Sequence, residues 1–136
     1  MTRYIALVDR ADGAVGFSFP DLPGCVAQGA SFEEAYDLAV AAIAEWTAEV
    51  AADGGDAPAP STLQALTARD DVEIALGEGA AIAFVPLIRL SGRATRANMS
   101  MDEGLLAEID DEARRRGVTR SAWIASAARE ALRRSA

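Results

Sequence analysis

The sequence contains no histidine and a single cysteine, Cys25, among its 136 residues. Without histidine the chain cannot build a Ser-His-Asp triad, a Cys-His pair or the common zinc sites, which excludes most hydrolase mechanisms. One cysteine cannot form an internal disulfide, and we interpret it as a small buried residue. We therefore predict a protein that is not an enzyme, with no catalytic residue, metal site or cofactor.

Long apolar runs are also lacking. The longest, residues 80–88, is far below the roughly 20 residues that span a bilayer, and residues 1–4 lead into a strand-like segment without a signal-peptide core. Apolar residues make up 51% of the chain and charged residues 25%, as in ordinary globular proteins. We expect a soluble, cytoplasmic protein.

Charge is distributed unevenly along the chain. Residues 1–92 hold four arginines and 14 acidic residues, whereas residues 93–136 hold nine arginines and seven acidic residues. The acidic part favours a cationic partner and the mildly basic part an anionic one, with plain solvated charge as the alternative.

The first part of the chain predicts a small antiparallel sheet with a cover helix. Turn-forming residues separate three short strands, expected at 3–9, 15–19 and 25–28. Ser31 and Glu34 form a capping box that starts a helix ending near 53–55. Its expected inward stripe is Ala35, Leu38, Ala39, Ala42, Ile43, Trp46 and Val50.

After the helix, a Pro-containing connection leads to a second, shorter helix over residues 61–69. The apolar run 80–90 then predicts a strand beside the meander, and Pro86 favours either a position at the edge of the sheet or a bulge.

The last part of the chain predicts a strand followed by two helices. Alternation from residue 95 to 101 gives this strand two faces. Acidic residues at 102–103 begin one helix, Gly117 ends it, and Thr119 caps the other. In the second helix the expected buried residues are Ala122, Trp123, Ile124, Ala127, Ala128, Ala131 and Leu132.

A lone strand in so small a segment has no partner for its backbone groups and too little core, so we expect two chains to pair around a two-fold axis, in a homodimer or a higher homo-oligomer. The expected dimer core is Ala97, Met99, Met101, Leu106, Ile109, Trp123 and Ile124. This leaves Arg96, Asn98 and Ser100 on the outer face of a two-stranded ribbon. Such residue types read base edges in the major groove, so we predict that they contact DNA bases. A dimerisation module with a solvated outer face is the alternative.

The stretches Arg-Ala-Asn-Met-Ser-Met-Asp at 96–102 and Gly-Val-Thr-Arg-Ser-Ala-Trp at 117–123 resemble the ribbon-helix-helix family of DNA-binding proteins. The resemblance implies that Arg120 and Ser121, at the start of the second helix, hold a DNA phosphate, as helix N-termini do. Ala97 departs from the family, which prefers Val or Ile there.

The first part resembles the N-terminal domain of HicB antitoxins. The most distinctive piece is Phe-Pro-Asp-Leu-Pro-Gly-Cys at 19–25, with Tyr-Ile-Ala-Leu-Val at 4–8 before it and Ser-Phe-Glu-Glu-Ala at 31–35 after it. The resemblance implies an α+β protein with a partial ribonuclease-H-like domain over residues 1–90 and a ribbon-helix-helix domain over 91–136. The first domain would bind and neutralise a HicA-type toxin that cleaves mRNA. The second would dimerise and repress the protein's own operon by binding operator DNA.

Two other functions remain open from the sequence. Asp9, Asp21 and Glu33 or Glu34 are the only sensible carboxylates for a metal-dependent nuclease, although turns and helix starts already use such acids. A transcription regulator that senses a small ligand would need a pocket with convergent polar groups.

Overall fold

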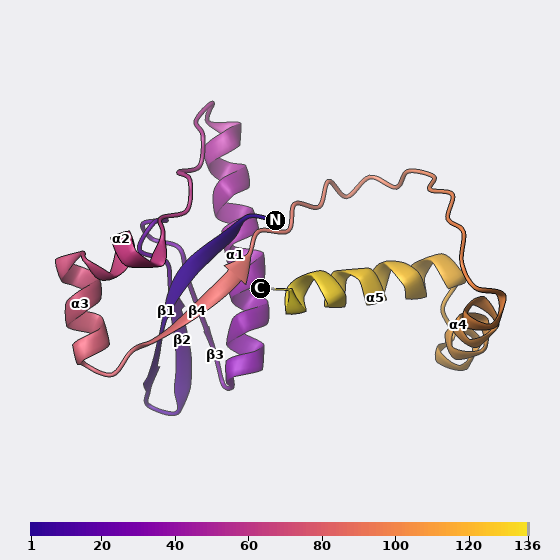
Figure 1. The fold of residues 1–136 in the computed structure, drawn as a ribbon, viewed down its shortest axis with the longest axis horizontal. Coiled ribbons are helices and arrows are strands. Elements are labelled where there is room, and N and C mark those ends of the chain that lie inside the picture. The colour runs from indigo at the N-terminus through magenta and orange to yellow at the C-terminus, as the bar shows by residue number, and fades with distance from the viewer. Residues whose placement is uncertain (136) are drawn as a thin grey trace. The chain divides into compact units, whose positions relative to one another are not determined.

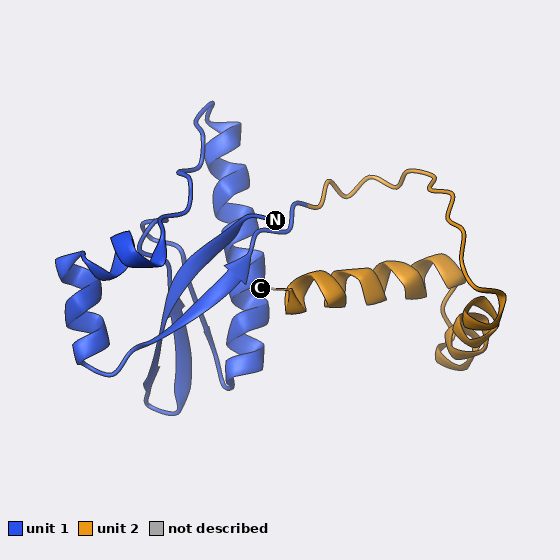
Figure 2. Ribbon diagram, in the orientation of Figure 1, with its two compact units in different colours: residues 1–89, 136 blue, residues 90–135 orange. Residues whose placement is uncertain are grey.

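The computed structural model describes residues 1–135, which form two compact units, 1–89 and 90–135 (Figure 2). The first unit contains β1 (Arg3–Ala11), β2 (Ala14–Ser18), β3 (Val26–Gly29), α1 (Phe32–Ala52), α2 (Leu63–Thr67), α3 (Asp70–Gly77) and β4 (Ala81–Pro86). The second contains α4 (Glu103–Arg116) and α5 (Arg120–Arg134). Residue 136, the last of the predicted ribbon-helix-helix domain, lies outside the described residues. No described helix is both long and apolar enough to cross a membrane.

The four strands form one antiparallel sheet in the order β3-β2-β1-β4, which confirms the predicted meander. Asp12 and Gly13 both have positive φ, 52° and 77°, as required in the tight turn that joins β1 to β2. The prediction for Pro86 is also confirmed: β4 lies at the edge of the sheet, and Pro86 pairs with Arg3 at its end.

The capping box at the start of α1 is present. Ser31 Oγ accepts a hydrogen bond from the Glu34 N–H at 3.1 Å, and the Glu34 carboxylate accepts one from the Ala30 N–H at 2.9 Å. The prediction for Leu38 was wrong, because its side chain is 45% exposed. Val40 and Thr47 are buried instead, which places the buried arc slightly further round the helix.

Helices cover the sheet on two sides, with α1 on one face and α2 and α3 on the other (Figure 1). The larger core lies under α1, where Phe17 of β2 and Tyr4 of β1 pack with Ile43. The smaller core joins Ile5 to Leu66 of α2 and Val72 of α3. Helix α3 was not predicted from the sequence, which indicated a single helix over 61–69.

Side chains tie the irregular segments of the first unit to its core. The Tyr4 hydroxyl donates a hydrogen bond to the Pro58 carbonyl at 2.7 Å, and the Trp46 indole donates one to the Pro23 carbonyl at 3.1 Å. Gly29 allows β3 to approach α1 closely, since a Cβ there would lie 2.6 Å from the Ala35 nitrogen. These contacts hold the loops around the sheet in fixed positions.

Both helices of the second unit begin as predicted, and α4 also ends as predicted. Asp102 caps α4 by accepting from the Leu105 N–H at 2.9 Å, and Gly117 ends it in the left-handed conformation with φ 69°. Thr119 caps α5 by accepting from the Ala122 N–H at 3.1 Å. The turn 117–119 therefore fixes where α5 begins relative to α4.

The predicted strand over residues 95–101 is not formed in the single chain, where residues 87–102 contain neither helix nor strand. The physical reason is that an isolated strand leaves its backbone N–H and C=O groups unpaired, so it needs a partner strand that one chain does not supply. The side chains predicted to be buried along α5 are not buried within one chain, and their burial in a dimer stays a prediction.

Candidate functional site

The predicted base-reading residues lie in the irregular segment that precedes α4. Arg96, Asn98 and Ser100 are all exposed. Ala97 and Met99, predicted to face the opposite way, are exposed as well, Met99 by 61%. The alternation of the sequence therefore does not yet separate an inner from an outer face, and the assignment of these roles stays a prediction.

The predicted dimer core is only partly buried within one chain. Ile109 of α4 is buried, while Met101, Leu106, Trp123 and Ile124 are partly exposed. Only Ile109 and Ala113 are buried among the described residues of the second unit. Two helices with so few buried side chains lack the core that a stable domain needs.

The start of α5 presents backbone donors. The Thr119 cap satisfies the Ala122 N–H, whereas helix geometry leaves the N–H groups of Arg120 and Ser121 without acceptors inside the helix. Both side chains are exposed. Free N–H groups together with the helix dipole favour an anion at this position, which agrees with the predicted phosphate contact but does not test it.

The Arg120 guanidinium forms a two-pronged ion pair with Asp110 of α4. Nε donates to Oδ1 at 2.7 Å and one terminal nitrogen donates to Oδ2 at 2.6 Å. The hydrogen bonds from Arg120 lower the pKa of Asp110, and those to Asp110 raise the pKa of Arg120. The side chains are 52% and 32% exposed, so the pair lies at the surface in contact with solvent.

Most arginines of the second unit are already neutralised by a neighbouring carboxylate. Glu112 binds both Arg115 and Arg116, which lowers its pKa to about 2. The other arginines in ion pairs are Arg114, Arg120, Arg133 and Arg134. Within residues 90–135, Arg93, Arg96 and Arg129 make no such pair. Two of the three, Arg93 and Arg96, lie in the irregular segment, and Arg96 is itself one of the predicted base-reading residues.

The carboxylates considered for a nuclease have separate structural surroundings. Asp21 accepts hydrogen bonds from the backbone and hydroxyl of Ser61, and Glu34 completes the cap of α1. Asp9 lies on β1, opposite Gly16 of the neighbouring strand. Among residues 1–135, no three carboxylate or thiol side chains come together in a way that could hold a metal ion.

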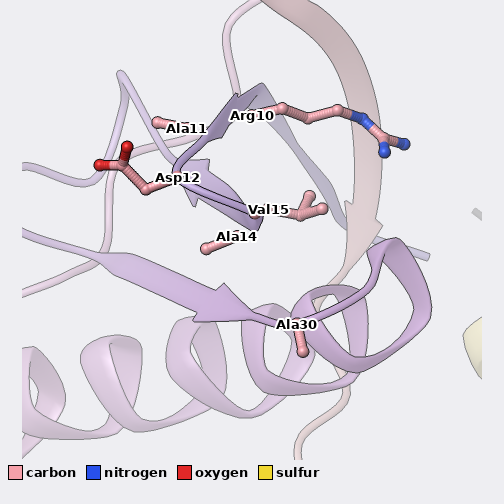
Figure 3. A pocket seen from close by; sticks show the side chains of 7 residues that line it. Arg10, Ala11, Asp12, Ala14, Val15 and Ala30 are labelled. Carbon is pink, nitrogen blue, oxygen red and sulfur yellow. The ribbon is translucent and has the colours of Figure 1, made fainter.

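A shallow hollow of about 200 Å³ lies at the β1–β2 hairpin, beside the residue that precedes the α1 cap. Its two charged side chains are Arg10 and Asp12, and they point away from each other (Figure 3). The remaining lining residues are Ala11, Gly13, Ala14, Val15 and Ala30. This hollow lacks the convergent polar groups that fix a small ligand.

Cys25 is buried, as the sequence indicated. Burial raises the pKa of its thiol to about 11, so the thiol stays protonated at neutral pH. A protonated thiol is a poor nucleophile, and Cys25 packs as a small apolar residue in the core beneath α1.

The Asp110–Arg120 pair is the feature of this region that sequence reasoning missed. The two residues lie ten positions apart, on different helices. The available signal was the short turn at Gly117, which brings the end of α4 close to the start of α5. The direction of the side chains follows only from the packed helices.

Residues 4–128 match the family model described as HicB-like antitoxin of bacterial toxin-antitoxin system. The crystal structure of antitoxin HicB from Burkholderia pseudomallei is similar at 29% identity, over 97% of both chains, with a TM-score of 0.53. The antitoxin HicB3 structure is similar at 26% identity, over 96% of this chain and 98% of that one, with a TM-score of 0.55. A chain of a HicA3 and HicB3 toxin-antitoxin complex shares the fold at 20% identity, over 64% of this chain and 99% of that one, with a TM-score of 0.53. A search of curated proteins gave no significant match.

Proposed function

The chain belongs to the HicB-like antitoxin family of bacterial toxin-antitoxin systems, and from this premise we propose that it binds and neutralises a HicA-type toxin that cleaves mRNA. We further propose that it dimerises through its second unit and represses its own operon by binding operator DNA. The protein acts by binding, without catalysis and without a cofactor, in the cytoplasm.

The observation that carries the proposal is the extent of the family match. Residues 4–128 include the whole sheet except Arg3, its cover helices, α4 and most of α5. A match limited to the first unit would have supported toxin binding alone. A match across both units supports a protein that combines the two binding activities in one chain.

The acidic charge of the first unit and its closed core support toxin binding by this unit. Its sheet is covered on both faces and its core is closed within residues 1–89. Residues 1–92 carry 14 acidic residues against four arginines. Such a surface attracts a basic partner and accelerates its association. The proposed role for this unit is to cover a basic ribonuclease and block its access to RNA.

The unfinished core of the second unit supports dimerisation. If residues 95–101 of two chains pair as antiparallel strands, each strand gains hydrogen-bond partners, and the exposed Met99 gains a place in a shared core. Trp123 and Ile124 of α5 can then pack over the same core. In the single chain these apolar side chains are exposed to water, which is unfavourable in free energy. Pairing with a second copy buries them.

Once such a ribbon forms, its outer face carries Arg96, Asn98 and Ser100 from each chain. These side chains have the donor and acceptor groups that distinguish base pairs in the major groove. The free N–H groups at the start of α5 and the Arg120 side chain then fit the flanking phosphates. The two sets of contacts have different roles, since base contacts give sequence specificity and phosphate contacts position the protein on the duplex.

Copurification tests the proposal. The tagged chain is expressed with the untagged product of the neighbouring small gene, and the complex is washed with increasing salt. We expect a small basic protein to remain bound in a fixed ratio. Loss of that protein at low salt would contradict neutralisation by tight binding, because only a loose electrostatic contact dissociates so readily.

A further inference from the structure

Arg120 holds its Asp110 partner in the same way that it would hold a DNA phosphate. The guanidinium uses Nε and one terminal nitrogen, at 2.7 and 2.6 Å, to bind both oxygens of one carboxylate. Carboxylate and phosphate both offer a pair of anionic oxygens that fit this fork, so they compete for the same donors. One arginine cannot present that edge to both acceptors at once.

This pair differs from the other well-formed ion pairs of the second unit. Arg114, Arg115, Arg116 and Arg134 bind acids three or four residues away on their own helix. Arg120 instead binds across the turn to α4, at the first residue of α5. The carboxylate of Asp110 therefore lies beside the helix start that suits an anion.

We propose that Asp110 is a built-in competitor that occupies the phosphate-binding side chain of Arg120 in the absence of DNA. DNA binding then exchanges the carboxylate for a backbone phosphate. This inference rests on the proposed DNA-binding function. The exchange is feasible because exposed ion pairs contribute little stability and are screened by salt.

The consequence is a lower affinity for every duplex. Each phosphate contact by Arg120 requires the loss of its pair with Asp110, whatever the base sequence. Only a duplex that also satisfies Arg96, Asn98 and Ser100 compensates for that loss. At a given protein concentration the operator is then occupied while the many non-specific sites stay largely empty.

The test uses the full chain with Asp110→Asn, which removes the competing charge and keeps the size of the side chain. Binding is measured on the duplex upstream of the chain's own gene and on a scrambled duplex, at several salt concentrations. We expect several-fold tighter binding to both duplexes. The gain should shrink as the salt concentration rises, because salt screens the Asp110–Arg120 pair that opposes binding in the parent chain.

Asp111→Asn is the matched control. It removes the same charge one residue away, but Asp111 pairs with Arg114 on its own helix. We expect a smaller rise in affinity from this variant. Asp110→Asn combined with Arg120→Ala should bind no more tightly than Asp111→Asn combined with Arg120→Ala, since the competition needs both partners. Far-ultraviolet circular dichroism verifies that each variant keeps its helices.

Two results would overturn the inference. If Asp110→Asn and Asp111→Asn had equal effects, Asp110 would act only through the repulsion between its negative charge and DNA. Weaker binding by Asp110→Asn alone would make Asp110 a residue that positions Arg120 for DNA rather than one that competes with DNA. Failure of the parent chain to bind either duplex at any salt concentration would instead refute the DNA-binding function itself.

Discussion

Asp21 and Ser61, forty residues apart, are joined by two hydrogen bonds. The carboxylate of Asp21 accepts from the Ser61 N–H and from the Ser61 hydroxyl, both at 2.7 Å, and its side chain is only 8% exposed. Arg69 lies 3.7 Å from the same carboxylate. The loop after β2 is thereby fastened to the segment that leads into α2, which keeps the second cover of the sheet in place.

Asp21→Ala should destabilise the first unit by about 2–3 kcal/mol, because hydrogen bonds to a charged group are lost and their donors stay partly buried. Chemical denaturation followed by circular dichroism measures the loss. Asp56→Ala, at an exposed acid in the same connecting segment, is the control and should change stability little. Equal effects of the two changes would show that the link does not hold the loop.

The fragment 1–90 should fold alone and bind the toxin while losing all DNA binding. Its sheet and both cores are complete without the second unit. Size-exclusion chromatography with the toxin and a mobility-shift assay with the operator measure the two activities. An unfolded fragment, or one that fails to bind a toxin that the full chain binds, would contradict the assignment of toxin binding to the first unit.

Met99→Asp should abolish dimerisation and operator binding together. In the proposed ribbon it places two unpaired charges in a small shared core, at a cost of several kcal/mol. Ser100→Asp, one residue along and on the opposite face, is the control and should remain dimeric while losing DNA affinity. Sedimentation measures the oligomeric state, and a Met99→Asp variant that remains dimeric would rule out the proposed strand register.

Asn98→Ala and Arg120→Ala should weaken DNA binding in different ways. Loss of the Asn98 amide should cost about 1–3 kcal/mol at each base contact, and only on the correct operator. Loss of Arg120 should weaken binding to any duplex and flatten the salt dependence. Competition between operator and scrambled duplexes separates the two. If Asn98→Ala binds both as the parent does, the outer face of the ribbon does not read bases.

The sequence was most informative where a local pattern determines structure. Ser31, Gly117 and Thr119 each mark a helix end through the chemistry of one or two residues, and each lies at the end it predicted. The succession of the first three strands followed from the turn residues between them. Such signals depend only on residues that are close together in the sequence, so they can be recognised in one sequence without knowledge of the packing.

Features that depend on distant packing were harder to predict. The side chain of Arg69, which precedes helix α3, makes no cap, and the helix is held by the burial of Val72 against the sheet. Leu38 has the spacing of a buried residue, yet the orientation of α1 on the sheet leaves it exposed. The strand expected at 95–101 depends on a second chain, and the Asp110–Arg120 pair depends on how two helices meet.

Growth of cells that express the neighbouring toxin gene, with and without this chain, tests the central claim most directly. If the protein is the antitoxin of that toxin, induction of the toxin alone should arrest growth and coexpression of the full chain should restore it. The fragment 1–90 should restore growth as well, since the proposed toxin-binding surface lies within it. Growth that stays arrested although the chain is present, folded and abundant would contradict the account.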